Sequence, residues 1–118
     1  MENSSIITEK TSELALLLKQ SEEYREFVRA REAAFSKEST RLLLKDYRAL
    51  QTRLQAASLG GSPDEGELLK LQRLGELLQL DPAASEYLFA QYRLNAVLAQ
   101  VYKTLAEAVD ADLSMIDD

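Results

Sequence analysis

Two pairs of acidic side chains have types and spacings that could support acid–base chemistry. Glu22 and Glu23 are adjacent, and Glu65 and Glu67 are separated by one residue. Paired carboxylates can serve as a general acid and a general base. Both pairs fall in the first turn of an expected helix, where acidic residues stabilise the helix dipole and complete the N-terminal cap. We interpret them as helix-stabilising residues and not as a catalytic pair.

Other catalytic and metal sites are excluded by residue type. Asp110, Asp112 and Ser114 match the first three ligands of a calcium loop, but Met115 stands where glycine is required. The chain has no Cys and no His, which removes thiolate and imidazole ligands and the base that a serine nucleophile needs. Gly60-Gly61 lacks the Lys-Ser/Thr pair of a phosphate loop. We expect no catalytic residue, no cofactor and no metal, and therefore no enzyme.

Composition predicts one acidic globular domain over residues 1–118. Fourteen Lys+Arg against 20 Asp+Glu give a net charge of −6, and 46% of the residues are hydrophobic. The N-terminus has no basic segment of a signal peptide. The longest apolar run, Leu14–Leu18, is far shorter than the about 20 residues of a membrane span. We expect a cytoplasmic protein that does not associate with membranes.

The densest basic segment runs from Arg41 to Arg53 and interleaves Lys45, Asp46 and Arg48 with apolar residues. Nucleic-acid binding needs a concentrated basic patch that neutralises phosphates. Because this segment alternates charge with apolar positions in an acidic chain, we interpret it as a solvated helix face. No direct contact with nucleic acid is expected.

The sequence predicts an all-α fold. Strong helix formers dominate, there are only two prolines and four glycines, and no segment alternates with a period of two. We expect an antiparallel helical bundle of about five helices with a long C-terminal helix, oligomerising through helix faces. The expected helices are residues 6–19, 22–35, 37–59, 63–80 and 82–115.

Local signals mark where these helices begin. Ser21 and Ser36 are expected N-caps. Ser62-Pro63-Asp64-Glu65 has the pattern of a capping box with proline at the first helical position, and Asp81-Pro82 repeats the combination of cap and proline. Gly75 interrupts an apolar face, which fits either a close helix approach or a tolerated defect. The residues expected to face inward on the third and fourth helices are Leu43, Tyr47, Leu50, Leu54, Ala57, Leu68, Leu71, Leu74 and Leu78.

The C-terminal helix is long enough, and apolar over enough of its circumference, to predict an interface. Its range gives a rod of roughly 50 Å, longer than the roughly 28 Å across a compact domain of this size. Its apolar arc spans about 180°, whereas one core contact needs about 100°. Either the same chain covers the whole arc or a second subunit covers part of it, and the length favours a homo-oligomer, a dimer or larger. The predicted interface residues are Tyr87, Leu94, Asn95, Leu98, Val101, Tyr102 and Leu105.

The asparagine and the tyrosines of the C-terminal helix can each be interpreted in two ways. Asn95 fits a register-setting residue inside a helical interface, and equally a partly exposed amide at the margin of the arc. Tyr87, Tyr92 and Tyr102 fit interface aromatics, or core residues whose hydroxyl groups reach water.

A series of packing and capping residues follows in order along the chain, from about Ile6 to Leu113. It comprises Leu14, Leu17, Ser21-Glu22-Glu23-Tyr24, Phe27, Tyr47, Gln51, Gly60-Gly61, Leu71, Leu78, Asp81-Pro82, Tyr87, Leu94, Leu98 and Val101. In order and spacing this series resembles the YlbF/YmcA family of small bacterial regulators.

The resemblance implies an all-helical bundle that assembles through its long helices and acts as a cytoplasmic adaptor. Some members form complexes with related proteins, are linked to competence, biofilm formation and sporulation, and are thought to steer an endoribonuclease in RNA processing. The implied partners are related family members or a ribonuclease complex. Complexes of some members hold an iron–sulfur cluster through cysteines, which this chain, with no Cys, cannot do.

A helical scaffold or chaperone-like protein is the alternative function. Such a protein holds an unfolded or helical client in an apolar groove that stays open after oligomerisation. Exposed apolar surface in the assembled protein is the feature that separates this alternative from a regulatory adaptor.

Overall fold

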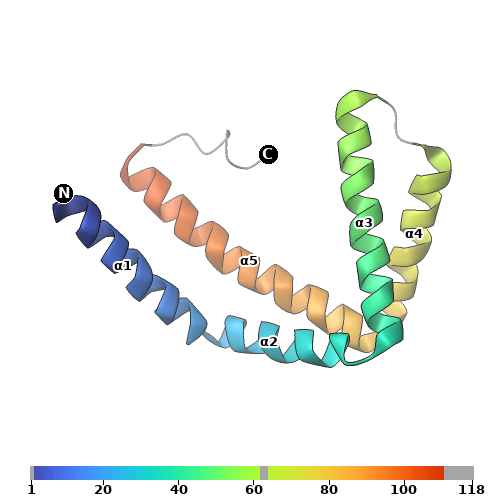
Figure 1. The fold of residues 1–118 in the computed structure, drawn as a ribbon, viewed down its shortest axis with the longest axis horizontal. Helices are drawn as coiled ribbons and strands as arrows, with labels where there is room; N and C mark the ends of the chain where they lie inside the picture. The colour runs from blue at the N-terminus through green and yellow to red at the C-terminus, as the bar shows by residue number, and fades with distance from the viewer. Residues whose placement is uncertain (1, 62–63, 111–118) are drawn as a thin grey trace. The chain divides into compact units, whose positions relative to one another are not determined.

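The structure is a computed structural model that describes residues 2–61 and 64–110. These residues form five helices and no strand, which confirms the predicted all-α class (Figure 1). The helices are α1 (Glu2–Lys19), α2 (Glu22–Phe35), α3 (Glu38–Gly60), α4 (Glu65–Leu80) and α5 (Pro82–Ala108).

Contacts divide the chain into two compact units. Unit 1 comprises the residues up to Val28 together with those from Ala90 onward, and unit 2 comprises Arg29–Phe89. The expectation of a single domain over residues 1–118 stays a prediction. Each unit is described by itself below.

Unit 2 holds the large buried side chains of the described chain. Its main element is an antiparallel hairpin in which α4 packs along α3 (Figure 1). The predicted seam of α3 is confirmed, because Leu50 and Leu54 are buried and Leu43, Tyr47 and Ala57 are half-buried. On α4 the inward face is carried by Leu71, Leu74 and Leu78, whereas Leu68 is exposed. The buried apolar residues of unit 2 are Ala34, Leu44, Leu50, Leu54, Leu78, Ala84 and Tyr87.

Unit 1 combines α1, the start of α2 and most of α5. Within it α5 runs alongside α1 and α2 (Figure 1), and an ion pair joins Arg93 of α5 to Glu26 of α2. The only fully buried apolar residues of its described part are Ala90 and Ala106, and α1 has no buried residue at all. Burial in unit 1 is therefore far less complete than in unit 2.

Two predicted caps are confirmed and one is wrong. The hydroxyl of Ser21 accepts the N–H of Tyr24 at 3.2 Å and so caps α2. Asp81 caps α5, as predicted. Ser36 does not cap α3: its hydroxyl donates back to the carbonyl of Ala33 at 2.8 Å, and the N-cap position belongs to Lys37, which makes no side-chain cap bond. Ser36 therefore closes the end of α2 instead of opening α3.

The capping box before α4 is shifted. The predicted cap and proline, residues 62 and 63, lie outside the described residues. The helix begins at Glu65, and the cap is Asp64, whose carboxylate accepts the N–H of Gly66 at 2.9 Å.

Helix ends differ from the expected ranges at both ends of the chain. α1 begins at Glu2 instead of residue 6. α5 ends at Ala108 instead of residue 115, and Val109 and Asp110 form a turn in which Asp110 has a φ of 54°. Acidic residues at a helix C-terminus oppose the helix dipole, which favours an early end. Residues 111–115, including most of the failed calcium-loop match, lie outside the described residues.

No helix in the described ranges combines the length and the hydropathy that crossing a bilayer requires. The same residues contain no group of three or more His, Cys, Asp or Glu side chains placed to hold a metal ion.

Replacing Gly75 with alanine should stabilise the protein by about 0.5–1 kcal/mol, because alanine is the better helix former. A Cβ at this position would meet Tyr47 Cε2 at 3.7 Å, an ordinary van der Waals distance, so α3 leaves room for it. Thermal unfolding followed by circular dichroism measures the change. A loss of stability would show that another group packs against Gly75 in solution.

Candidate interaction surfaces

The predicted interface residues do not form one surface. Tyr87 belongs to unit 2, where it is only 4% exposed. Its ring lies 5.3 Å, centroid to centroid, from that of Phe35, and its hydroxyl accepts a hydrogen bond from Arg48 at 3.4 Å. Tyr87 is thus a core residue of its own chain, which leaves it little surface to offer a partner.

The other six predicted residues lie together on α5 in unit 1. Leu94, Leu98 and Val101 are half-buried, which means that their own chain covers part of each side chain. Asn95 is exposed, as are Tyr102 at 60% and Leu105 at 57%. The apolar face of α5 is therefore partly covered at Leu94–Val101 and open at its C-terminal end.

The residues predicted for the interface did not include the exposed apolar side chains of α1. Ile7 and Leu17 are 65% and 62% exposed, although Ile7 shares a helix face with the half-buried Leu14 and Leu18. The spacing of these apolar residues was the available signal. We define the open apolar surface of unit 1 as Ile7, Leu17, Tyr102, Leu105 and Val109.

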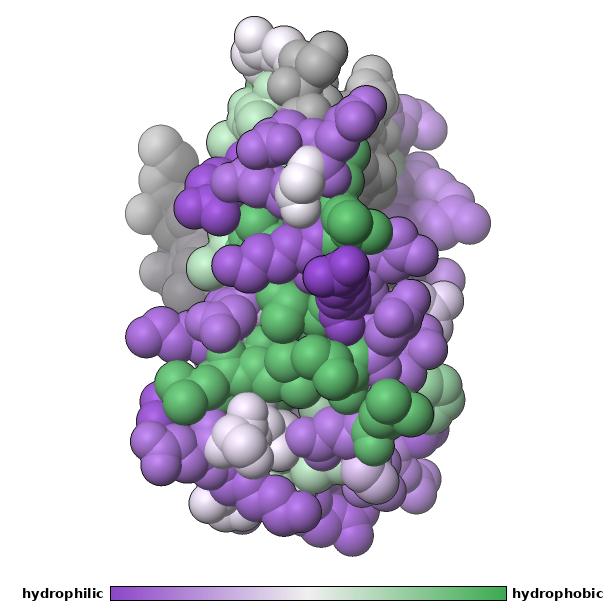
Figure 2. All heavy atoms as spheres, turned by 90° about the vertical axis from the view of Figure 1, so that its right-hand side faces the viewer, coloured by the Kyte–Doolittle hydropathy of each residue, from purple (hydrophilic) through white to green (hydrophobic). Residues whose placement is uncertain are grey.

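A second apolar surface lies on unit 2. Figure 2 shows hydrophobic side chains gathered in a band across the face that carries α4, bordered by hydrophilic residues. The exposed leucines of α4 are Leu68, Leu69, Leu77 and Leu80. Unlike unit 1, however, unit 2 also has a buried core, so these leucines are additional to a packed interior.

A junction of α3, α4 and α5 is fixed by one carboxylate. Asp81 Oδ1 accepts the N–H groups of Ala83 and Ala84 at 3.1 and 3.3 Å, and Oδ2 accepts the hydroxyl of buried Thr40 at 2.6 Å. The Thr40 hydrogen bond is the largest cause that lowers the pKa of Asp81 below its usual value. Partial burial opposes this shift, while the two backbone N–H groups and the charge of Lys37 reinforce it. The side chain caps α5 and ties it to α3.

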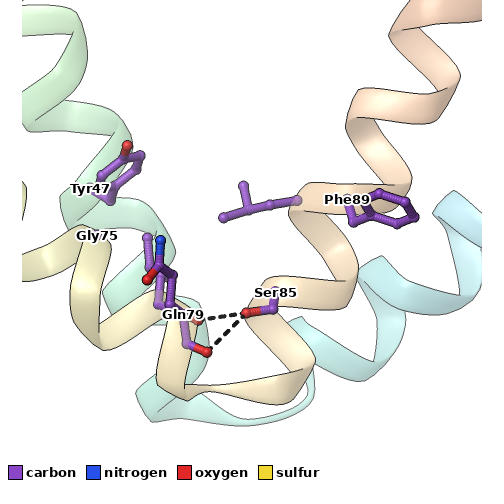
Figure 3. Close-up of a pocket in the computed structure, with 7 residues that line it drawn as sticks. Tyr47, Gly75, Gln79, Ser85 and Phe89 are labelled. Carbon is purple, nitrogen blue, oxygen red and sulfur yellow. Dashed lines mark hydrogen bonds between the residues drawn. The ribbon is translucent and has the colours of Figure 1, made fainter.

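An apolar cavity of about 380 Å³ opens above this junction. Figure 3 shows Tyr47, Gly75 and Gln79 on the side of α3 and α4, and Ser85 and Phe89 on α5. The hydroxyl of Ser85 donates to the carbonyl oxygen of Leu78 at 3.0 Å, so it is already engaged. The cavity therefore offers shape and apolar contact, and its lining carries no paired acid and base.

A smaller cavity of about 120 Å³ lies beside α3 and has a different character. Phe35, Leu44 and Tyr87 form its apolar walls, and Arg41, Lys45 and Arg48 place three cations around it. The guanidinium of Arg48 stands 6.0 Å from the ring centroid of Tyr87. We call Arg41, Lys45 and Arg48 the basic row. It lies within the segment from Arg41 to Arg53 that the sequence predicted to be a solvated face, and all three side chains are exposed.

Comparison with protein families gives a match over almost the whole described chain. The family model described as "Control of competence regulator ComK, YlbF/YmcA" matches residues 7–110. A UPF0342 protein of Symbiobacterium thermophilum is 40% identical over 101 residues, 85% of this chain and 90% of that protein. A UPF0342 protein of Desulfitobacterium hafniense is 36% identical over 104 residues, 87% of this chain and 84% of that protein.

Two solved structures share the fold. A Bacillus stearothermophilus protein of unknown function (DUF964) aligns with a TM-score of 0.77 at 17% identity, covering 88% of this chain and 92% of that one. Bacillus subtilis RicA, solved in complex with RicF, aligns with a TM-score of 0.65 at 15% identity, covering 91% and 96%. At these identities the likeness concerns the fold.

Proposed function

Because the chain belongs to the YlbF/YmcA family of competence-regulator control proteins, we propose that it is a non-enzymatic cytoplasmic adaptor that acts by binding proteins. Its first partner in this proposal is a second copy of itself, and related family members are further partners. The surface that binds them is the open apolar surface of unit 1.

The main support for this proposal is the incomplete core of unit 1. Its described residues bury no large apolar side chain, and α1, an 18-residue helix, has no buried residue. Most of the stability of a helix in a protein comes from packing its apolar face, and not from intrinsic propensity. A partner that covers the open apolar surface supplies that packing, and large apolar side chains left exposed on a surface mark protein–protein contacts.

The relatives support a role in protein assembly. The solved structure of Bacillus subtilis RicA contains it together with RicF, so a protein of this fold forms a complex with another protein. The family description concerns the control of a regulator, which fits an adaptor. Residues Leu94, Leu98 and Val101 extend the proposed interface along α5, with Asn95 at its margin.

Sedimentation equilibrium tests the proposal. We expect the wild-type chain to self-associate at micromolar concentration, and Tyr102→Asp with Leu105→Asp to raise the dissociation constant by about 100-fold, two losses of about 1.4 kcal/mol each. Both side chains are largely exposed, so the variant should keep its helical circular dichroism spectrum.

The matched control is Leu69→Asp with Leu77→Asp, which removes two exposed leucines from α4. It should leave self-association unchanged. A wild-type chain that stays monomeric, or a control that dissociates while the α5 variant does not, would overturn the proposed interface.

The apolar cavity at Tyr47 and Phe89 favours a second candidate, a scaffold or chaperone-like role. A client side chain fits a cavity of this volume if it stays open in the assembled protein. A fluorescent dye that binds exposed apolar surface distinguishes the two functions: persistent binding to the oligomer supports the scaffold, and its loss on assembly supports the adaptor.

A further inference from the structure

The net negative charge of the chain lies in unit 1. Unit 2 contains nine Lys+Arg and nine Asp+Glu, whereas the rest of the chain contains five and eleven, so the whole net charge of −6 belongs to unit 1. Two copies brought together through unit 1 alone would therefore meet with like charges. An assembly that also sets unit 1 of one copy against basic groups of the other relieves this repulsion.

The basic row is concentrated on one face of α3. Arg41, Lys45 and Arg48 fall within an arc of roughly 60° at 100° per residue. Among the described residues, no carboxylate lies within ion-pair distance of Arg41 or Lys45. Like charges at i and i+4 destabilise an isolated helix, so such a row gains from an acidic partner.

An acidic row lies on α1. Glu2, Glu9 and Glu13 fall within an arc of roughly 40°, and all three are exposed. This arc faces away from Leu14 and Leu18, the half-buried residues of the same helix. Among the described residues Glu2 and Glu9 form no ion pair, and they are available to another molecule. Glu13 pairs with Lys10 of its own helix at 3.3 Å, an exposed contact that a partner's cation can replace.

The two rows share two of their spacings, and a small cavity lies beside the basic row. The acidic row has gaps of seven and four residues, and the basic row has gaps of four and three, so two positions of each row can align at once. Glu2 and Glu9 can align with Arg41 and Arg48, or Glu9 and Glu13 with Arg41 and Lys45. The small cavity beside the basic row has apolar walls from Phe35, Leu44 and Tyr87. A glutamate side chain suits it, because its methylene groups contact the apolar walls while its carboxylate meets the cations.

We propose that the acidic row of α1 in one copy docks on the basic row of α3 in a second copy, with the contact made twice in a symmetric pair. This inference rests on the proposed self-association and names a second, electrostatic surface for it. In a symmetric pair each chain gives its own acidic row and receives the acidic row of the other chain, so the contact is made twice and the assembly is closed. The contact also orients the two copies, since complementary charge sets register and the rate of encounter.

Charge reversal on each row separately tests the proposal. Arg41→Glu with Lys45→Glu, and in another chain Glu9→Lys with Glu13→Lys, should each raise the dissociation constant of self-association at least about 10-fold at low salt. Glu9→Lys with Glu13→Lys makes the chain less negative and so reduces the overall repulsion between two copies. Weaker association of this variant therefore cannot be caused by net charge. Lys70→Glu with Arg73→Glu on α4 is the control with the same net charge as the first variant, and it should associate more tightly than that variant.

Mixing the two row variants gives the decisive result. In the mixed pair each acidic row again faces a basic row, so we expect association restored to about the wild-type level and weakened by added salt. If both variants are folded and their mixture does not associate, the proposed contact between two chains is wrong. The acidic and basic rows would then pair within one chain or not at all.

The two proposals fail separately. If the row variants self-associate like the wild type while Tyr102→Asp with Leu105→Asp dissociates, the charged contact is wrong and the apolar interface stands. If the row variants dissociate and the mixture recovers while the Tyr102 and Leu105 variant stays associated, the apolar interface is wrong and the charged contact stands.

Discussion

Replacing Asp81 with alanine should lower the free energy of unfolding by about 2–3 kcal/mol. The substitution removes the cap of α5, through which Asp81 accepts the N–H groups of Ala83 and Ala84. It also removes the acceptor of the Thr40 hydroxyl, which is 1% exposed and would lose this partner in the interior. Urea unfolding followed by circular dichroism measures the loss.

Asp64 is a matched control for this substitution. It is the same residue type in the same capping position, it is exposed, and its bond to the N–H of Gly66 stays within its own helix. Asp64→Ala should therefore cost only about 1 kcal/mol. Thr40→Val combined with Asp81→Ala should cost less than the sum of the two single changes, because they share one hydrogen bond. Equal losses for Asp64→Ala and Asp81→Ala would contradict the tertiary role of Asp81.

The same carboxylate should make stability depend on pH. The pKa of Asp81 in the folded chain is lowered, chiefly by the Thr40 hydrogen bond. Its contribution is therefore complete above the unfolded pKa of about 3.9 and is lost as pH falls through the folded pKa. Asp81→Asn should lose stability at pH 7 but show a flatter dependence on pH below about 4. An unchanged slope in this acid range would show that Asp81 titrates alike in both states.

The start of a helix was predictable where the capping side chain and the backbone conformation both favour a helix beginning at the same residue. Asp81 is followed by proline, which restricts the preceding backbone to extended conformations, so sequence and structure agree there. Ser36 shows the limit. A serine between two helices can accept from the helix that follows or donate to the one that precedes, and here it donates to Ala33. Composition carries no signal for that choice.

The candidate interface was predictable as a face but not in its extent. Periodicity identified the apolar arc of α5, and Leu94, Leu98 and Tyr102 do share it. How much of that arc the same chain covers depends on what packs beside each turn. Tyr87 at the start of the helix meets Phe35 and is buried, whereas Tyr102 fifteen residues later is exposed. Contacts with other helices cause this difference, and the spacing of residues along one helix gives no information about those contacts.

Charge averaged over the chain concealed the basic row. A net charge of −6 argued against any basic surface, yet Arg41 and Lys45 belong to a unit with no net charge. The row itself follows from helical spacing and was open to prediction. Its association with the aromatic ring of Tyr87 was not, because that ring comes from α5, 39 residues beyond Arg48.

Replacing Leu78 with alanine should cost about 2–5 kcal/mol, the largest single loss that we expect. Leu78 is 2% exposed at the inner face of α4, where this helix packs against α3. Truncation removes buried methyl groups and leaves a cavity that a rigid helix hairpin fills poorly. The unit that carries the basic row would lose stability as a whole, so the loss should appear in a single cooperative urea transition.

Leu77 provides the comparison, because it precedes Leu78 in the same helix but is 52% exposed. Leu77→Ala should cost less than about 1 kcal/mol, as for surface positions generally. The two substitutions have the same chemistry and nearly the same helix propensity cost, so their difference isolates burial. If Leu77→Ala costs as much as Leu78→Ala, and the cost grows with protein concentration, then a second chain covers α4 in solution. The interface would then belong on α4, and the assignment to α5 and α1 would be wrong.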